Sequence, residues 1–252
     1  MNCNVPTDIC FSFEGFCARG GKTDEHQDGW GIAFFEGTGC RLFLDVNPSI
    51  DSPIAEVVKN YPIKSTHVIA HIRKATQGKI TLENCHPFRR EIWGKYWVFA
   101  HNGNLENFEP GDYSFYQPVG TTDSEKAFCL ILNRLREKYP HHEPDLESLL
   151  QVLKTITEEI RDSGVFNYLI SNGEHFFAHC STQLHYIIRE SPFGVAQLID
   201  EDVKVDFQAL TESSDRVAII ATTPLTHNET WTAMQPGELL LFQDGKPLMI
   251  LK

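Results

Sequence analysis

The sequence contains five short polar clusters, each beside an apolar run that is typical of a buried strand or helix. An arginine among them could hold a carboxylate, an aspartate could hold an ammonium group, and an Asn-Gly pair could stabilise an oxyanion. Strand ends and the loops that follow them are where a rigid scaffold presents reactive groups. Together these groups suit acyl transfer on an α-amino acid. The clusters are HQDGWG (26–31), HIRKAT (71–76), HPF (86–88), HNGNLEN (101–107) and TTDS (121–124).

Two other kinds of site fit the sequence poorly. Gly21-Lys22-Thr23 resembles the end of a phosphate-binding loop, but that loop requires a glycine where Phe16 stands. His67 and His71 have the spacing of metal ligands on a helix, yet they lie in a strand-like segment, and no HExxH motif is present. We therefore expect neither a nucleotide site nor a metal site.

Composition narrows the possible partners. The chain has 252 residues, 22 basic and 34 acidic side chains, and a formal net charge of −12. A surface of this charge repels nucleic acid and anionic membranes, so neither is expected as a partner. The start of the chain lacks the features of a signal peptide, and no apolar run is long enough to span a membrane. Seven cysteines without a CxxC pair indicate reduced thiols and a cytoplasmic protein.

Hydrophobic periodicity predicts a β-rich chain with two helices together in the middle. Because helices and strands do not alternate, this order favours an α+β layered sandwich over a doubly wound sheet. Asn102-Gly103 is expected to form a turn, and the glycine-rich segment 15–31 a mobile loop. The expected strands are 29–35, 41–44, 66–72, 96–101, 166–171, 175–180, 184–189, 217–222 and 239–242, and the expected helices start at Ser52-Pro53, Thr122 and Asp145.

In their order and spacing, the clusters resemble the class II glutamine amidotransferase domain, an N-terminal-nucleophile hydrolase, and in particular its stand-alone bacterial members. The matching motifs are HQDGWGIAF, AHIRKAT, HPF, AHNGNLENF and TDSEKAF. The resemblance implies a single domain over residues 1–252, folded as a four-layer αββα sandwich. It also implies cleavage of the γ-amide of glutamine or of a γ-glutamyl compound, with no metal or organic cofactor.

The resemblance also implies a role for individual residues. Asn102 and Gly103 would form the oxyanion hole. Arg73 would pair with the substrate carboxylate, and Asp123 with its ammonium group. The remaining pocket residues would be Thr76 and His86, with Asp28 and Gly29 shaping the loop beside the nucleophile.

The beginning of the sequence departs from the family pattern. The family nucleophile is an N-terminal cysteine whose own amine serves as base, whereas this sequence begins Met1-Asn2-Cys3, without the apolar strand that follows the nucleophile in relatives. Cys3 is a weak substitute, because its nitrogen is an amide. We expect a few additional N-terminal residues to carry the nucleophile, and we expect the chain as given to be inactive. Gln77 also replaces a family histidine, which leaves the acyl donor open.

Two alternatives remain open at this stage. The protein could be a glutaminase subunit that donates ammonia to a separate synthase, since the sequence contains no synthase domain of its own. It could also be a non-catalytic amino-acid-binding protein on the same fold.

Overall fold

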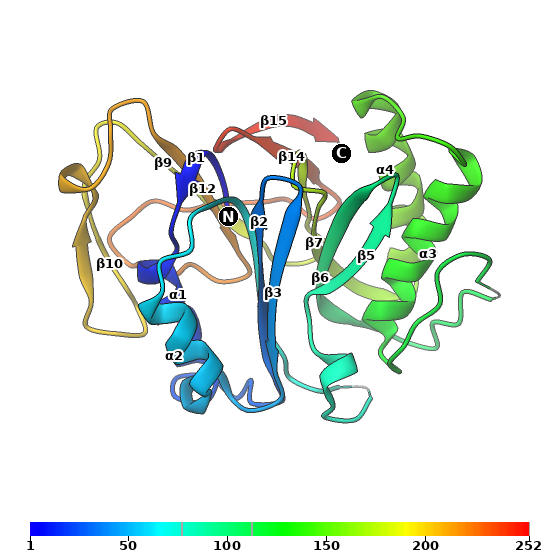
Figure 1. The fold of residues 1–252 in the computed structure, drawn as a ribbon, viewed down its shortest axis with the longest axis horizontal. Coiled ribbons are helices and arrows are strands. Elements are labelled where there is room, and N and C mark those ends of the chain that lie inside the picture. The colour runs from blue at the N-terminus through cyan, green and yellow to red at the C-terminus, as the bar shows by residue number, and fades with distance from the viewer. Residues whose placement is uncertain (77, 112, 252) are drawn as a thin grey trace.

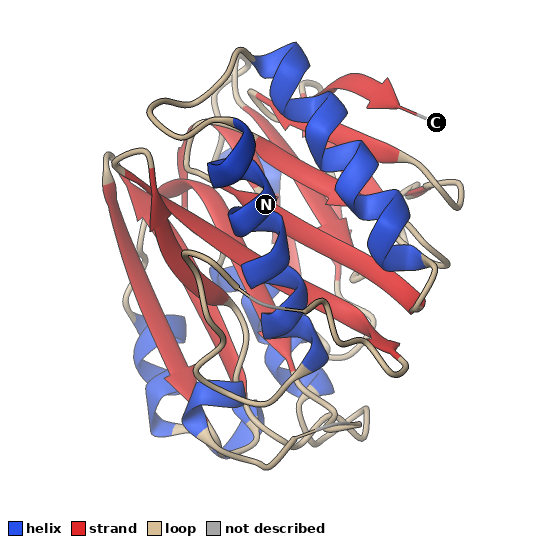
Figure 2. Cartoon of the chain, turned by 90° about the vertical axis from the view of Figure 1, so that its right-hand side faces the viewer, coloured by secondary structure: helices blue, strands red, loops and turns tan. Residues whose placement is uncertain are grey.

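The computed structural model describes residues 1–76, 78–111 and 113–251. Two antiparallel sheets lie face to face, with one pair of helices outside each sheet (Figure 1). Figure 2 shows α3 and α4 crossing the outer face of one sheet, while the other helices lie behind. The protein is therefore a four-layer αββα sandwich, as expected. The helices are α1 (Cys10–Arg19), α2 (Pro53–Asn60), α3 (Asp123–Lys138) and α4 (Leu146–Arg161).

The first sheet has seven strands in the order β13-β9-β12-β1-β4-β2-β3, and the second has six in the order β15-β14-β8-β7-β6-β5. A two-stranded ribbon of β10 and β11 stands apart. The strands of the first sheet are β1 (Asn2–Thr7), β2 (Trp30–Glu36), β3 (Gly39–Asp45), β4 (Ser65–Ile72), β9 (His185–Glu190), β12 (Arg216–Ala221) and β13 (Thr232–Ala233). Those of the second are β5 (Phe88–Ile92), β6 (Lys95–Leu105), β7 (Gly164–Ser171), β8 (Phe176–His179), β14 (Leu239–Gln243) and β15 (Lys246–Leu251), and the ribbon is β10 (Val195–Gln197) with β11 (Lys204–Asp206).

Three apolar clusters fill the spaces between the four layers. Phe13 and Trp30 belong to the cluster that includes α1, α2 and the first sheet. Ile69 and Phe176 lie between the two sheets, and Phe128 packs with α4 residues against the second sheet. The two sheets thus share one buried interface, and the site residues emerge at its edge.

The predicted helix starts are confirmed. The side chains of Ser52, Thr122 and Asp145 each accept a hydrogen bond from a backbone N–H in the first turn of α2, α3 and α4. A side-chain oxygen at this position satisfies one of the backbone donors left unpaired at a helix start. These starts follow from local sequence, because the donor and the acceptor are only three residues apart.

Two local expectations are wrong, and one strand was not predicted. Asn102-Gly103 is not a turn; it lies inside β6, where it pairs with Asn167 and Phe166 of β7. The segment 15–31 is not wholly loop, because Cys10–Arg19 forms α1, with Cys17 and Ala18 fully buried. Residues Asn2–Thr7 form strand β1, although their sequence contains no apolar run. In each case pairing or packing with distant residues overrides the local preference.

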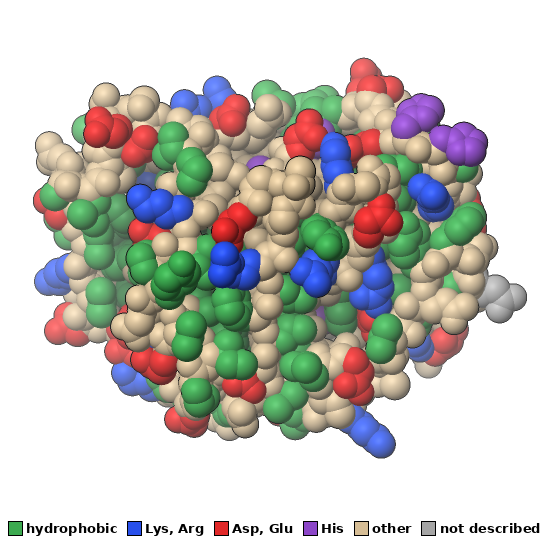
Figure 3. Space-filling model, in the orientation of Figure 1, with side chains coloured by type: hydrophobic (Ala, Val, Ile, Leu, Met, Phe, Trp, Pro, Cys, Tyr) green, Lys and Arg blue, Asp and Glu red, His purple; other side chains and the backbone are tan. Residues whose placement is uncertain are grey.

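No helix within the described ranges is long and apolar enough to cross a membrane. Acidic and basic side chains are interspersed over the face shown in Figure 3.

Candidate active site

A cavity of about 330 Å³ lies where β4, β6 and the start of α3 meet. It collects residues that are far apart in the sequence. Six of the predicted site residues line it: Arg73, Thr76, His86, Asn102, Gly103 and Asp123. The cavity is also lined by His26, His71, His101 and Ser124, which belong to the polar clusters but have no predicted role. Gln77 lies outside the described residues.

Arg73 follows the end of β4, and backbone carbonyls hold its guanidinium group. Its Nη1 donates to Lys79 O at 3.1 Å and to Asp28 O at 3.5 Å, and its Nη2 donates to Gly78 O at 3.5 Å. The residue is 4 % exposed. A guanidinium group that is fixed in this way is preorganised for a planar anion such as a carboxylate.

Asp28 and Gly29 support Arg73 from behind and are not among the lining residues. Asp28 N donates to Arg73 O at 3.0 Å, and Arg73 N donates to Gly29 O at 2.8 Å. The Asp28 carboxylate accepts a hydrogen bond from Ala75 N at 2.7 Å. Gly29 has a φ of +104°, and a Cβ there would lie 2.6 Å from Cys85 Sγ. Both residues therefore hold the loop that carries Arg73.

Asp123 is the first residue of α3 and is 6 % exposed. One carboxylate oxygen accepts a hydrogen bond from Leu105 N at 2.8 Å, which joins α3 to the end of β6. The position at a helix N-terminus stabilises the negative charge. The carboxylate is therefore held in place beside the cavity, where it can receive a cationic group.

Burial lowers the pKa of three histidines of the cavity. The rings of His71 and His86 are 4.2 Å apart between centroids. Burial lowers the pKa of His71 to about 3 and that of His86 well below its usual range. Burial also lowers the pKa of His101, whose ring contacts Ser124 Oγ at 2.8 Å and Val165 O at 2.9 Å. The lowered pKa values favour the neutral forms of these imidazoles.

Several nitrogen atoms of these rings are buried without a partner in the described part of the chain. They are Nδ1 of His71 and both ring nitrogens of His86. Buried polar atoms normally have a hydrogen-bond partner. A polar ligand or water in the cavity would supply one. Across the described ranges, no group of three or more His, Cys, Asp or Glu side chains is placed to hold a metal ion.

Asn102 and Gly103 lie side by side on β6 and are both exposed to the cavity. The buried Asn167 side chain donates to Asn102 O at 3.1 Å, which fixes the strand at this point. A Cβ on residue 103 would lie 1.9 Å from Val165 O, so only glycine fits between β6 and β7. A side-chain amide next to a rigid backbone amide is the usual composition of an oxyanion hole.

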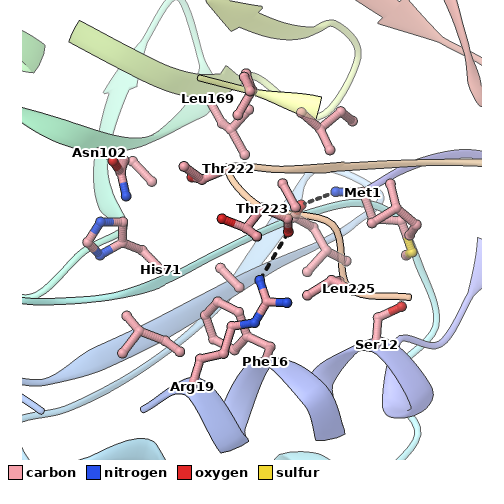
Figure 4. A pocket seen from close by; sticks show the side chains of 18 of the residues that line it. Met1, Ser12, Phe16, Arg19, His71, Asn102, Leu169, Thr222, Thr223 and Leu225 are labelled. Atoms are coloured by element: carbon pink, nitrogen blue, oxygen red, sulfur yellow. Dashed lines mark hydrogen bonds between the residues drawn. The ribbon is translucent and has the colours of Figure 1, made fainter. Parts of the chain in front are cut away.

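A second cavity, of about 240 Å³, forms a slot between β4 and β12 beyond Met1. Figure 4 shows Met1 at one end of this slot and His71 and Asn102 at the other. β1 pairs with β4 and β12 from Asn2 onward, and Met1 adds two backbone hydrogen bonds to Val68 of β4. The slot shares His26, His71, Ile72 and Asn102 with the larger cavity, so the two adjoin.

The structure does not bring Cys3 to the cavity. Its side chain is 3 % exposed, and its Sγ lies 3.9 Å from Ser65 O. Burial raises the pKa of the Cys3 thiol to about 11. A buried thiol in this state is not a nucleophile at neutral pH.

Solved structures with the same fold place the chain in a class of proteins. A structure titled "predicted glutamine amidotransferase" from Pseudomonas aeruginosa matches with a TM-score of 0.78 and 48% identity, covering 98% of this chain and 97% of that one. A phosphoribosylpyrophosphate amidotransferase of Bacillus subtilis matches with a TM-score of 0.56 and 17% identity over 95% of this chain and 45% of that one, which shows a shared fold alone. The architecture is thus that of the N-terminal-nucleophile glutamine amidotransferase domains.

Sequence comparison gives the family. The model of the family described as "Glutamine amidotransferases class-II" matches residues 1–252. The chain is 52% identical to "Putative glutamine amidotransferase YafJ" of Escherichia coli, over 98% of this chain and 96% of that protein. It is 51% identical to a "Putative glutamine amidotransferase" of Haemophilus influenzae, over 98% and 84% of the two chains. The chain belongs to the class II glutamine amidotransferase family.

Proposed function

We propose that this protein is an amidohydrolase that cleaves the γ-amide of glutamine, or of a γ-glutamyl compound, through a cysteine thioester. One observation carries the proposal. A single cavity holds a fixed cation, Arg73, a fixed anion, Asp123, and the amide pair of Asn102 and Gly103. This combination matches a zwitterionic amino acid with a reactive carbonyl at the end of its side chain.

The two charged residues would bind the groups on the α-carbon of the substrate. Arg73 would pair with the α-carboxylate, and Asp123 would accept hydrogen bonds from the α-ammonium group. Burial favours the neutral forms of His71, His86 and His101. Lys74, which also lines the cavity, pairs with Glu25 at 2.8 Å. Thr76 and His86 complete the proposed substrate pocket.

The nucleophile would come from residues that precede Met1 and occupy the slot. Val68 exchanges two hydrogen bonds with Met1, at 2.8 and 2.9 Å, so these residues are directly paired across β1 and β4. If β1 continued in this register, the fifth residue before Met1 would stand opposite Arg73, because Arg73 lies five positions beyond Val68. An N-terminal cysteine at that place would reach the cavity. The buried amine of Met1, whose pKa is lowered to about 5, would become an ordinary peptide nitrogen.

The chemistry then follows acyl transfer. The cysteine sulfur attacks the γ-carbonyl carbon, its proton passes through the free α-amine to the leaving nitrogen, and the C–N bond breaks to release ammonia. Asn102 and Gly103 would donate hydrogen bonds to the oxyanion, a contribution of about 3–4 kcal/mol to the barrier. Water then attacks the thioester, which releases glutamate and restores the thiol.

The partners of this reaction are a small-molecule substrate and, in the second candidate function, a synthase subunit that would take up the ammonia. The seven free cysteines suit a cytoplasmic setting. If the protein is a glutaminase subunit, adding its synthase partner would raise the rate of glutamine turnover. The turnover rate of a stand-alone hydrolase would not change.

Calorimetric titration of L-glutamine into the chain that begins at Met1 tests the pocket separately from the chemistry. We expect binding without turnover, and we expect Arg73→Ala to abolish the binding. Arg134→Ala, on the exposed side of α3, is the matched control and leaves it unchanged. Binding that survives Arg73→Ala refutes the assigned pocket. A chain that carries the N-terminal cysteine and binds but never hydrolyses supports the non-catalytic alternative.

A further inference from the structure

Asn84 is a buried residue beneath the cavity that the proposed chemistry does not use. It ends the short 3₁₀ helix Leu82–Asn84, and it is 1 % exposed. It precedes His86 by two positions but is not among the residues that line the cavity. A buried carboxamide is costly unless its donors and acceptor are satisfied, so its partners indicate its role.

The Asn84 side chain joins two loops that are far apart in the sequence. On one side, its Nδ2 donates to Lys79 O at 2.9 Å and to Thr81 Oγ1 at 3.2 Å. On the other side, its Oδ1 accepts a hydrogen bond from Thr121 N at 2.8 Å. Nδ2 also lies 3.4 Å from Thr121 Oγ1. We call this set of contacts the Asn84 bridge.

Each end of the Asn84 bridge leads directly to one charged residue of the site. Lys79 O, which accepts from Asn84, also accepts from Arg73 Nη1 at 3.1 Å. Thr121 stands immediately before Thr122, which caps α3, and α3 begins with Asp123. A single side chain thus lies between the support of the cation and the support of the anion.

The two loops are packed closely enough for the bridge to fix their spacing. A Cβ on residue 78 would lie 2.9 Å from Thr121 Oγ1, and a Cβ on residue 120 would lie 2.2 Å from Asn84 Oδ1. Glycine at both positions permits this approach. The Thr121 side is held a second time, because Glu125 accepts a hydrogen bond from Gly120 N at 2.6 Å and pairs with Arg90. The distance between the two loops therefore cannot change much without moving Arg73 relative to Asp123.

We propose that Asn84 is a positioning residue that sets the separation between the carboxylate subsite at Arg73 and the ammonium subsite at Asp123. The bridge makes the protein selective for ligands that carry both groups on one carbon atom. This inference rests on the proposed function, because it takes Arg73 and Asp123 as the two ends of one amino-acid site.

Three ligands, titrated into the full chain and followed by NMR, test the inference. L-Glutamine carries both groups, glutaramate lacks the ammonium group, and 4-aminobutanamide lacks the carboxylate. In Asn84→Ala, we expect the affinity for L-glutamine to fall about 10-fold or more. A small change in the distance between Arg73 and Asp123 weakens a ligand that must bind both at once. Each one-group ligand should lose less than about 2-fold, because it can follow its own subsite.

Asn133→Ala is the matched control. Asn133 is 4 % exposed, and its side chain also holds a loop, donating to Tyr116 O and accepting from Phe115 N. It therefore reproduces the loss of a buried carboxamide away from the site, and ligand affinities should not change. If Asn84→Ala does not fold, Asn84→Asp serves instead: it keeps the acceptor for Thr121 N, loses the donor to Lys79 O, and should weaken L-glutamine binding in the same selective way.

The inference is overturned if the Asn84 variants weaken all three ligands equally, if they weaken none, or if Asn133→Ala has the same selective effect. Failure of the wild-type chain to bind L-glutamine would instead refute the proposed function. The bridge is then judged without ligand, by the NMR signals of the Thr121 amide and the Arg73 Nε–H. Both should shift in Asn84→Ala, and a shift on one side alone refutes the bridge.

Discussion

A series of chains that differ only in the residues before Met1 tests where the nucleophile must stand. An N-terminal cysteine, exposed by cleavage of a tag, would be placed as the third, fourth, fifth or sixth residue before Met1, with small apolar residues between. The slot that receives them is lined by apolar side chains such as Ala70 and Ile219. The register of Met1 with Val68 predicts that the fifth position is the active one.

The expected magnitude follows from strand geometry. Each residue advances the chain by about 3.3 Å and turns the side chain to the opposite face. Because a misplacement of about 1 Å can cost about 100-fold in rate, the fifth position should exceed the fourth and the sixth by at least about 100-fold. Release of ammonia and glutamate from L-glutamine is the assay, with mass spectrometry to verify each N-terminus.

Serine in place of the cysteine at the fifth position is the control, and it should be inactive. It should also unfold at a higher temperature than the chain that begins at Met1, because the added residues can form backbone hydrogen bonds with Ala70 and Ile72, each worth about 1 kcal/mol net. Activity that is highest at another position, or that does not depend on position, would refute the register. An unchanged unfolding temperature would refute the occupation of the slot.

Three further predictions concern single residues. In the active extended chain, Gly103→Ala should lower kcat at least about 100-fold, because its Cβ would lie 1.9 Å from Val165 O and displace an oxyanion donor. Gly39→Ala is the control and should have no such effect, because a Cβ there would meet Glu36 O at 3.3 Å. Asp123→Asn should weaken L-glutamine binding at least about 10-fold in calorimetry and leave glutaramate binding unchanged, whereas Asp145→Asn at the start of α4 should affect neither. The free energy of unfolding in urea should fall by about 5 kcal/mol between pH 7 and pH 5.5. Burial lowers the pKa of His67 and of His179 to about 4, that of His71 to about 3 and that of His86 well below its usual range, so that below pH 6.5 the unfolded state binds protons that the folded state does not. His179→Gln should remove about 1 kcal/mol of that fall, and a stability that is constant over this range would contradict the reasoning.

Some features of this protein depend on neighbours in the sequence, and these were predictable. The starts of α2, α3 and α4 were found because a capping side chain and its backbone partner lie within one turn. The polar motifs were found because each is a continuous run beside an apolar strand. Their combination was sufficient to predict the family and the αββα sandwich.

Other features depend on pairing between distant segments, and local patterns gave the wrong prediction there. Asn102-Gly103 has the composition of a turn, yet β7 supplies a partner along the whole of β6 and draws both residues into the sheet. α1 contains Gly15, which lowers its helical propensity, but Gly15 lies against Leu198, where a Cβ would be 3.0 Å from a methyl carbon. Contacts with distant residues therefore determined the secondary structure of both segments.

The sequence by itself determined which chemical groups the site contains: a guanidinium, a carboxylate, an amide pair and several imidazoles. Only the tertiary structure decided that Arg73 and Asp123 line one cavity, that Cys3 lies outside it, and that a slot beside Met1 adjoins it. The reason is that residue types are read directly along the chain. Their separation in space is fixed by sheet register and by contacts such as those of Asn84, which join residues with no sequence signal in common.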